Sequence, residues 1–349
     1  MEQFVFLSIL SVLILFTIIW GFKTLPKEKW QIMAVLPKGK TLHGKWEGLN
    51  LTYYGLLCAN AYTFAVIIFF ILGASAQIPL SELGLLILAM LGLCMPASKI
   101  MARIVEKKKG TLTVGGAVFI GILAGPWLVY LMNLALGRTL RFDVNPTVFL
   151  SALCVAYAYG EGLGRLACIS FGCCYGKPLC GCSPFVQRLF SGFHLVFSGK
   201  TKKIAYASGL EGEKVIPVQI MTAGLYSVTA LIGTGLFLNG HYAAAFLESL
   251  IVTQVWRFVS EFFRADFRGG LKITPYQLMA LGGIVYALAT VFFSPAPAGL
   301  PVLQAGLHAL WNPWMIFLIE SVWVAAFVHT GRSVVTGAEI SFHVHENKI

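Results

Sequence analysis

Long apolar stretches separated by short polar segments run through most of the chain. A helix needs about 17–25 apolar residues to cross a bilayer, and nine stretches have about this length. They are 3–21, 51–73, 83–98, 112–136, 147–167, 216–238, 242–263, 274–294 and 313–330. The stretch at 83–98 is short, and the last one is interrupted by Glu320. This pattern predicts an all-α polytopic membrane protein.

The first apolar stretch does not resemble a cleaved secretory signal. The residues before it, MEQ, carry no positive charge, and the segment WGFKTLPKEK after it offers no small-residue cleavage site. We therefore expect a membrane helix and basic loop in 1–50, a membrane core in 51–295, and a further helix and tail in 296–349. The longest polar insertion, 168–215, is expected to form a small polar cap on the core.

The composition supports a membrane protein. Hydrophobic residues make up 57% of the 349 residues and charged residues only 12%, whereas soluble domains carry roughly a quarter charged residues. The net charge of +11 would suggest a nucleic-acid partner in a soluble protein. In this chain it is better explained as loop charge at a membrane surface, so we expect no nucleic-acid partner.

The basic residues are distributed unevenly between the two predicted faces. With nine spans, one face receives six Lys and Arg residues in 23–45, five in 99–109, seven in 165–214, three in 264–272 and two after 330, whereas the opposite loops hold Arg138 and Arg141. The positive-inside rule predicts that the basic face is cytoplasmic. Eight cysteines, five of them in 168–182, suit a reducing compartment.

Two groups of charged residues lie inside the predicted spans, where ionisable side chains are costly and usually face a cavity or a partner. Glu161 and Arg165 are spaced i, i+4, and Arg257, Glu261 and Arg264 are spaced i, i+4, i+7, so each group is expected to share one helix face. They either neutralise each other and fix helix packing, or line a common pocket. We favour the pocket, because two guanidinium groups suit a phospholipid phosphate and a carboxylate beside them suits a base or an orienting acceptor.

The crowded cysteines allow three interpretations. The segment CCYGKPLCGC would offer a zinc site, although it lacks the usual CxxC pairs, through Cys173, Cys174, Cys180 and Cys182. A catalytic thiol at Cys173 or Cys174 would have Arg165 and Lys177 nearby to favour the thiolate. Packing of small side chains beneath a glycine turn is the interpretation that we favour, so no metal or other cofactor is expected.

The segment GRLACISFGCCYGKP, residues 164–178, resembles the signature of the prolipoprotein diacylglyceryl transferases. In that signature a Gly-Arg pair ends a membrane helix, and a Gly-x-x-x-Gly-Lys/Arg turn follows. Further similar segments occur in the family's order between residues 50 and 295. They are TYYGLL around Tyr54, SKIMARI with Lys99 in place of an arginine, GTLTVGG at 110–116, IPVQIM with Pro217 and Gln219, and WRFVSEFFR at 256–264.

This resemblance implies a seven-helix core with a cleft for a phospholipid, here with about one extra helix on either side. It implies an enzyme of the inner membrane of a bacterium that uses no cofactor. Such an enzyme transfers the diacylglyceryl group of phosphatidylglycerol to the cysteine thiol of a lipoprotein and releases glycerol phosphate.

The resemblance also implies roles for individual residues. Arg165 and Arg257 would hold the phosphate and stabilise the leaving group, Glu261 would orient Arg257 or a substrate hydroxyl, and Tyr54 would bind the lipid headgroup. Gly176 would leave room for the acceptor. The substrate-binding residues implied are Lys99, Glu161, Gly172, Gly176, Lys177, Gln219 and Arg264.

Several polar residues of the family are replaced here. The family's histidine in the GTLTVGG segment is Val114, so that candidate base is missing, and the other replacements are Cys168, Cys173, Ile216, Met221 and Thr222. Donor binding is thus better supported than the acceptor. The family's cleft faces the periplasm, whereas the basic residues predict a cytoplasmic site. The alternatives are a paralogue with a different, cytosolic acceptor, a non-catalytic phospholipid-binding or transport protein, and a thiol-redox protein built on Cys173 and Cys174.

Overall fold

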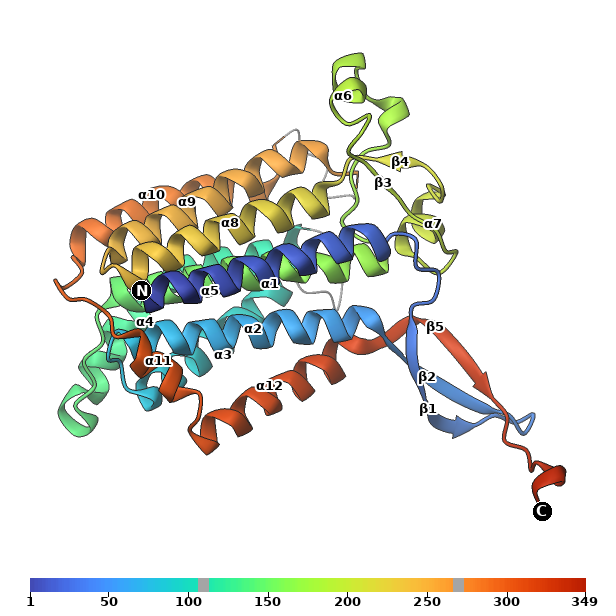
Figure 1. Ribbon diagram of the computed structural model, residues 1–349, viewed down its shortest axis with the longest axis horizontal. Helices are drawn as coiled ribbons and strands as arrows, with labels where there is room; N and C mark the ends of the chain where they lie inside the picture. The colour runs from blue at the N-terminus through green and yellow to red at the C-terminus, as the bar shows by residue number, and fades with distance from the viewer. Residues whose placement is uncertain (106–112, 266–272) are drawn as a thin grey trace.

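The computed structural model describes residues 1–105, 113–265 and 273–349. Among these, nine helices of 19 residues or more run back and forth along the long axis of the molecule (Figure 1). They are α1 (Glu2–Thr24), α2 (Tyr53–Ser75), α3 (Leu80–Val105), α4 (Val114–Leu140), α5 (Pro146–Phe171), α8 (Val218–Leu238), α9 (Tyr242–Ser260), α10 (Pro275–Phe293) and α12 (Pro313–Gly331). Eight of them, all but α9, are long and apolar enough to cross a membrane. The predicted all-α polytopic membrane fold is therefore confirmed.

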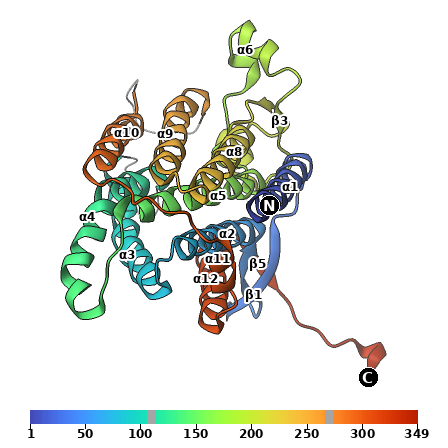
Figure 2. The same ribbon diagram turned by 60° about the vertical axis from the view of Figure 1, so that its left-hand side comes forward.

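Helix α5 lies at the centre of the bundle, beside α2, α8 and α9 (Figure 2). Its start is fixed by Asn145, whose side chain accepts a hydrogen bond from the Val148 amide, as expected of an N-cap. Small residues allow its neighbours to approach closely. An added Cβ at Gly160 would lie 2.9 Å from the Cβ of Ala65 on α2, and one at Gly162 would lie 3.2 Å from Ser227 Oγ on α8.

A three-stranded antiparallel sheet, which the sequence pattern did not predict, joins the segment after α1 to the segment after α12. Strands β1 (Ile32–Lys40), β2 (Trp46–Thr52) and β5 (Arg332–Ile340) pair in the order β1-β2-β5. Part of the basic loop expected in 1–50 and part of the tail expected in 296–349 therefore form ordered strands. These segments are short, and each becomes an ordered strand only by pairing with partners distant in sequence, as in the ion pair of Lys45 with Glu339 at 2.6 Å.

The basic segments gather at one end of the bundle. In Figure 1 the sheet, the end of α3, the segment after α5 and the end of α9 all lie at the right-hand end, whereas α4 ends at the left-hand end. Arg138 belongs to the last turn of α4, and Arg141 is its C-cap. Residues Lys107, Lys108, Lys109, Arg268 and Lys272 lie outside the described residues. The positive-inside rule still predicts a cytoplasmic location for the right-hand end.

The polar cap projects from this basic end. Helix α5 continues to Phe171, so the cap begins at Gly172 and not at residue 168. It contains η1 (Leu179–Gly181), α6 (Pro184–Leu189), β3 (Leu195–Val196), α7 (Lys203–Ser208) and β4 (Lys214–Val215). Lys202, only 1% exposed, ties the cap to the bundle, because its Nζ donates to Leu25 O at 2.9 Å and Ser170 O at 2.8 Å. Both carbonyls lie at helix C-terminal ends, where a cation is favoured.

We expect Lys202→Met to destabilise the protein by about 2–3 kcal/mol, because two buried carbonyls lose a charged donor. Burial lowers the pKa of Lys202 from 10.5 to about 8. Between these two values the unfolded chain binds a proton that the folded protein has lost, so the wild type gains stability as the pH rises. Thermal unfolding from pH 7 to 10.5 should show this gain in the wild type and not in Lys202→Met. The exposed neighbour Lys200 supplies the control, Lys200→Met, which should leave both the melting temperature and its pH dependence unchanged.

Candidate functional site

Two arginines from neighbouring helices meet at one carboxylate inside the bundle. Arg165 and Glu161 of α5 form an ion pair, as their i, i+4 spacing predicts. Arg257 of α9 places its Nη2 3.9 Å from the same Glu161 Oε1. The three side chains are only 14%, 11% and 13% exposed, in the order Arg165, Glu161, Arg257. The structure thus brings together two of the predicted catalytic residues and one predicted binding residue.

Tyr157 completes this group, and the sequence did not predict it as a site residue. Its hydroxyl accepts a hydrogen bond from Arg257 Nη2 at 2.6 Å. Tyr157, Glu161 and Arg165 are spaced i, i+4, i+8 on α5 and so share one helix face. This spacing is the signal by which the tyrosine could have been found.

The group carries more positive charge than its own carboxylate neutralises. Glu161 faces both Arg165 and Arg257, and in the part of the chain that the structure describes the buried Nε atoms of both arginines have no hydrogen-bond partner. A buried donor without a partner is costly, and an unmatched buried charge is more so. An anion with several oxygen acceptors would satisfy both needs. We call Tyr157, Glu161, Arg165 and Arg257 the arginine site.

The second predicted charge pattern is wrong beyond Arg257. Helix α9 ends at Ser260, Glu261 lies in the short helix η2 (Glu261–Phe263), and Arg264 is extended. The three residues therefore do not share a helix face. At this end of α9, the Phe258 carbonyl accepts a hydrogen bond from Gln277 Nε2 at 3.0 Å. The half-buried Glu261 still lies close enough for its charge to act on Arg257.

The glycine turn serves backbone packing. Gly172 ends α5 in the left-handed conformation, with φ +70°, which glycine adopts at low cost. An added Cβ at Gly176 would lie 2.3 Å from Ile216 O, so the space beside Gly176 is filled by the Ile216 backbone and offers no room for an acceptor. The Gly176 backbone also bridges to that of Arg264. The Lys177 side chain is exposed.

Three other predicted residues lie outside the arginine site. Gln219 on α8 is 1% exposed and donates through Nε2 to Cys173 O at 2.9 Å, so it holds the turn after α5. Tyr54, at the start of α2, packs against Phe171, with ring centroids 5.5 Å apart. Lys99 is exposed on α3 and is therefore not part of the buried charged group.

Three thiols converge directly beyond the arginine site. The Sγ atoms of Cys168, Cys173 and Cys174 all lie within 4.8 Å of one another; we call these residues the thiol cluster. Hydrogen bonds from the thiols of Cys168 and Cys173, together with the charges of Arg264 and Arg165, hold the pKa of the Cys174 thiol well below its usual value. The three thiols thus lie against one another and within reach of two arginine charges.

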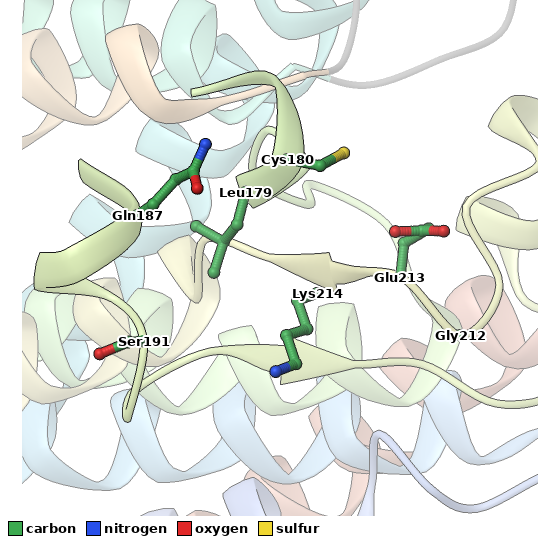
Figure 3. Close-up of a pocket in the computed structure, with 7 residues that line it drawn as sticks. All are labelled: Leu179, Cys180, Gln187, Ser191, Gly212, Glu213 and Lys214. Atoms are coloured by element: carbon green, nitrogen blue, oxygen red, sulfur yellow. The ribbon is translucent and has the colours of Figure 1, made fainter. Parts of the chain in front are cut away.

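The candidate zinc set of four cysteines is not assembled. Cys180, in η1, is exposed and lines an open recess of about 450 Å³ in the polar cap (Figure 3). The recess lies between η1, α6 and β4, and its lining residues are Leu179, Cys180, Gln187, Ser191, Gly212, Glu213 and Lys214. None of them belongs to the arginine site or the thiol cluster, so the recess is a separate feature of the cap.

The fold and this geometry define a multi-pass α-helical membrane protein with a buried, positively charged site near one end of its bundle. No known family model matches the chain, and no curated protein matches it. The class of protein therefore rests on the helices and on the arginine site.

Proposed function

We propose that the protein is a phospholipid-dependent transferase that moves the diacylglyceryl group of phosphatidylglycerol to a thiol. The observation that carries this proposal is the arginine site, where two buried guanidinium groups share one carboxylate and keep unpartnered Nε donors. The ordered segments that resemble the prolipoprotein diacylglyceryl transferases support the same function. They also support placing the protein in the inner membrane of a bacterium.

The depth of the arginine site suits a lipid phosphate. Arg165 lies six residues before the end of α5, which is about 9 Å at the rise of an α-helix. An arginine this close to the end of a membrane helix suits the interface, where lipid phosphates are found. The planar fork of guanidinium donors binds phosphate oxygens with defined geometry, so the arginine site would hold a headgroup while the acyl chains remain in the bilayer.

In the proposed reaction, an acceptor thiolate attacks the glyceryl carbon that carries the phosphate ester. The new carbon–sulfur bond forms as the carbon–oxygen bond breaks, and glycerol phosphate leaves with the bonding electrons. Arg165 and Arg257 would stabilise the charge that grows on the leaving phosphate. Glu161 contacts both arginines, so it serves to position them and is poorly placed to act as a base.

Two alternatives differ from this proposal, one in the acceptor and one in the absence of a reaction. The basic segments at the same end as the site favour a cytosolic thiol over an exported lipoprotein. The loss of the family's histidine at Val114 favours a protein that binds phospholipid without chemistry.

Release of glycerol phosphate distinguishes these functions. The purified protein would be placed in nanodiscs that contain phosphatidylglycerol labelled in its terminal glycerol, with a small thiol or a lipoprotein signal peptide as acceptor. We expect labelled glycerol phosphate to appear only with a thiol. Discs that contain phosphatidylethanolamine labelled in its ethanolamine should release no labelled phosphoethanolamine. Binding of phosphatidylglycerol without release would favour the lipid-binding alternative. Absence of both would contradict the proposal.

A further inference from the structure

We propose that Cys168, Cys173 and Cys174 form a three-thiolate zinc site whose fourth position takes the acceptor thiol. This inference rests on the proposed transferase function and adds a metal to it. It also replaces the sequence-based interpretation of these cysteines as packing residues.

The backbone builds the thiol cluster from two sides. Gly172 reverses the chain after α5, so that the Cys173 amide donates to Cys168 O at 3.0 Å. Cys174 has φ +56°, a conformation that is uncommon for residues other than glycine. Gln219 then fixes the turn through Cys173 O. These backbone contacts keep the three thiols close to one another.

The geometry and ligand type suit a soft ion. Zinc–sulfur bonds of about 2.3 Å place the sulfurs of a tetrahedral site about 3.8 Å apart. The cluster has its Sγ atoms within 4.8 Å of one another, so small side-chain rotations close it around an ion. Zinc sites with three protein ligands keep the fourth position for water or substrate.

The surrounding charge is complementary to such a site. Three thiolates and one divalent ion carry a net charge of −1, and the charges of both Arg165 and Arg264 act on Cys174. Cys168 also follows Arg165 by one helical turn. The cluster therefore places an ion beside the position proposed for the lipid phosphate.

The zinc site would supply the acceptor in its reactive form. An acceptor thiol that binds at the fourth position releases its proton to water and remains as a metal-bound thiolate. The thiolate sulfur attacks the glyceryl carbon and the carbon–oxygen bond breaks. Glycerol phosphate then leaves, and Arg165 and Arg257 stabilise its charge. The phospholipid loses its headgroup and the acceptor gains a thioether, with no oxidant or reductant. A base at position 114, where this chain has valine, is then unnecessary.

Metal content tests the site independently of activity. The full-length protein would be purified after growth with zinc, and zinc per chain measured by mass spectrometry. We expect about one equivalent in the wild type, and at least a tenfold loss in Cys168→Ser and Cys174→Ser. Cys180→Ser and Cys182→Ser, which change cap cysteines outside the cluster, should keep their zinc. Cobalt exchanged into the wild type should give thiolate charge-transfer absorption, a readout that does not depend on the folding of any variant.

The outcomes separate this inference from the proposed function. Zinc at the cluster without glycerol phosphate release would support the site and contradict the transferase. Turnover by wild-type protein that contains no zinc and gives no cobalt–thiolate absorption would overturn the site and leave the transferase standing. A disulfide within the cluster in place of bound metal, found by thiol titration of the protein purified under reducing conditions, would also overturn it.

Discussion

Arg165→Ala and Arg257→Ala are each expected to slow glycerol phosphate release by about 10²–10³-fold, the cost of removing one preorganised donor to a developing charge. Both guanidinium groups are buried and lie next to the same carboxylate. A water molecule that fills the space left by either side chain would not supply its positive charge. The effect should appear mainly in kcat, because the charge on the phosphate grows as the carbon–oxygen bond breaks. Rates in nanodiscs that contain phosphatidylglycerol would measure it.

Matched variants separate lost chemistry from lost folding. Arg165→Lys keeps a cation without the planar fork and should have intermediate activity. Arg138→Ala removes an exposed arginine at the opposite end of the bundle and should be silent. If the alanine variants stay folded and keep activity within about twofold of the wild type, the arginine site does not bind the reacting phosphate.

The membrane helices could be predicted because each is encoded locally. Apolar length alone located all nine long helices of the described residues, eight of which are apolar enough to cross a membrane. Even the weak stretch at 83–98 lies within the 26-residue helix α3. Glu161 and Arg165 could be paired for the same reason, since i, i+4 neighbours meet within one helix.

Features made by distant segments could not be predicted. Strand β5 forms by pairing with β2, almost 300 residues earlier in the chain. The contact of Arg257 with Glu161 requires the packing of α9 on α5, and no local spacing encodes it. The thiol cluster depends on two residues with positive φ, Gly172 and Cys174, and the sequence pattern suggested such a turn only at the glycine.

Glu161→Gln is expected to give the largest change in stability among single substitutions at the arginine site. Removing the carboxylate takes away the counter-charge that the buried Arg165 and Arg257 share, and breaking comparable buried pairs costs about 3–5 kcal/mol. Thermal unfolding in a neutral detergent would show a lower melting temperature. Glu261→Gln, which changes a half-buried carboxylate outside the site, is the matched control and should have a much smaller effect.

Phosphatidylglycerol should restore the stability that Glu161→Gln loses, because its phosphate would supply the missing negative charge. In the absence of lipid, Glu161 neutralises part of the charge that a phosphate would neutralise in the complex. An anion that binds only the folded state stabilises it by an amount that grows with the logarithm of its affinity, and the variant lacks the competing carboxylate. Phosphatidylglycerol should therefore raise the melting temperature more in Glu161→Gln than in the wild type, whereas a neutral lipid should raise both equally. An equal shift with phosphatidylglycerol would mean that the two arginines belong to a structural ion pair, and that the lipid phosphate binds elsewhere.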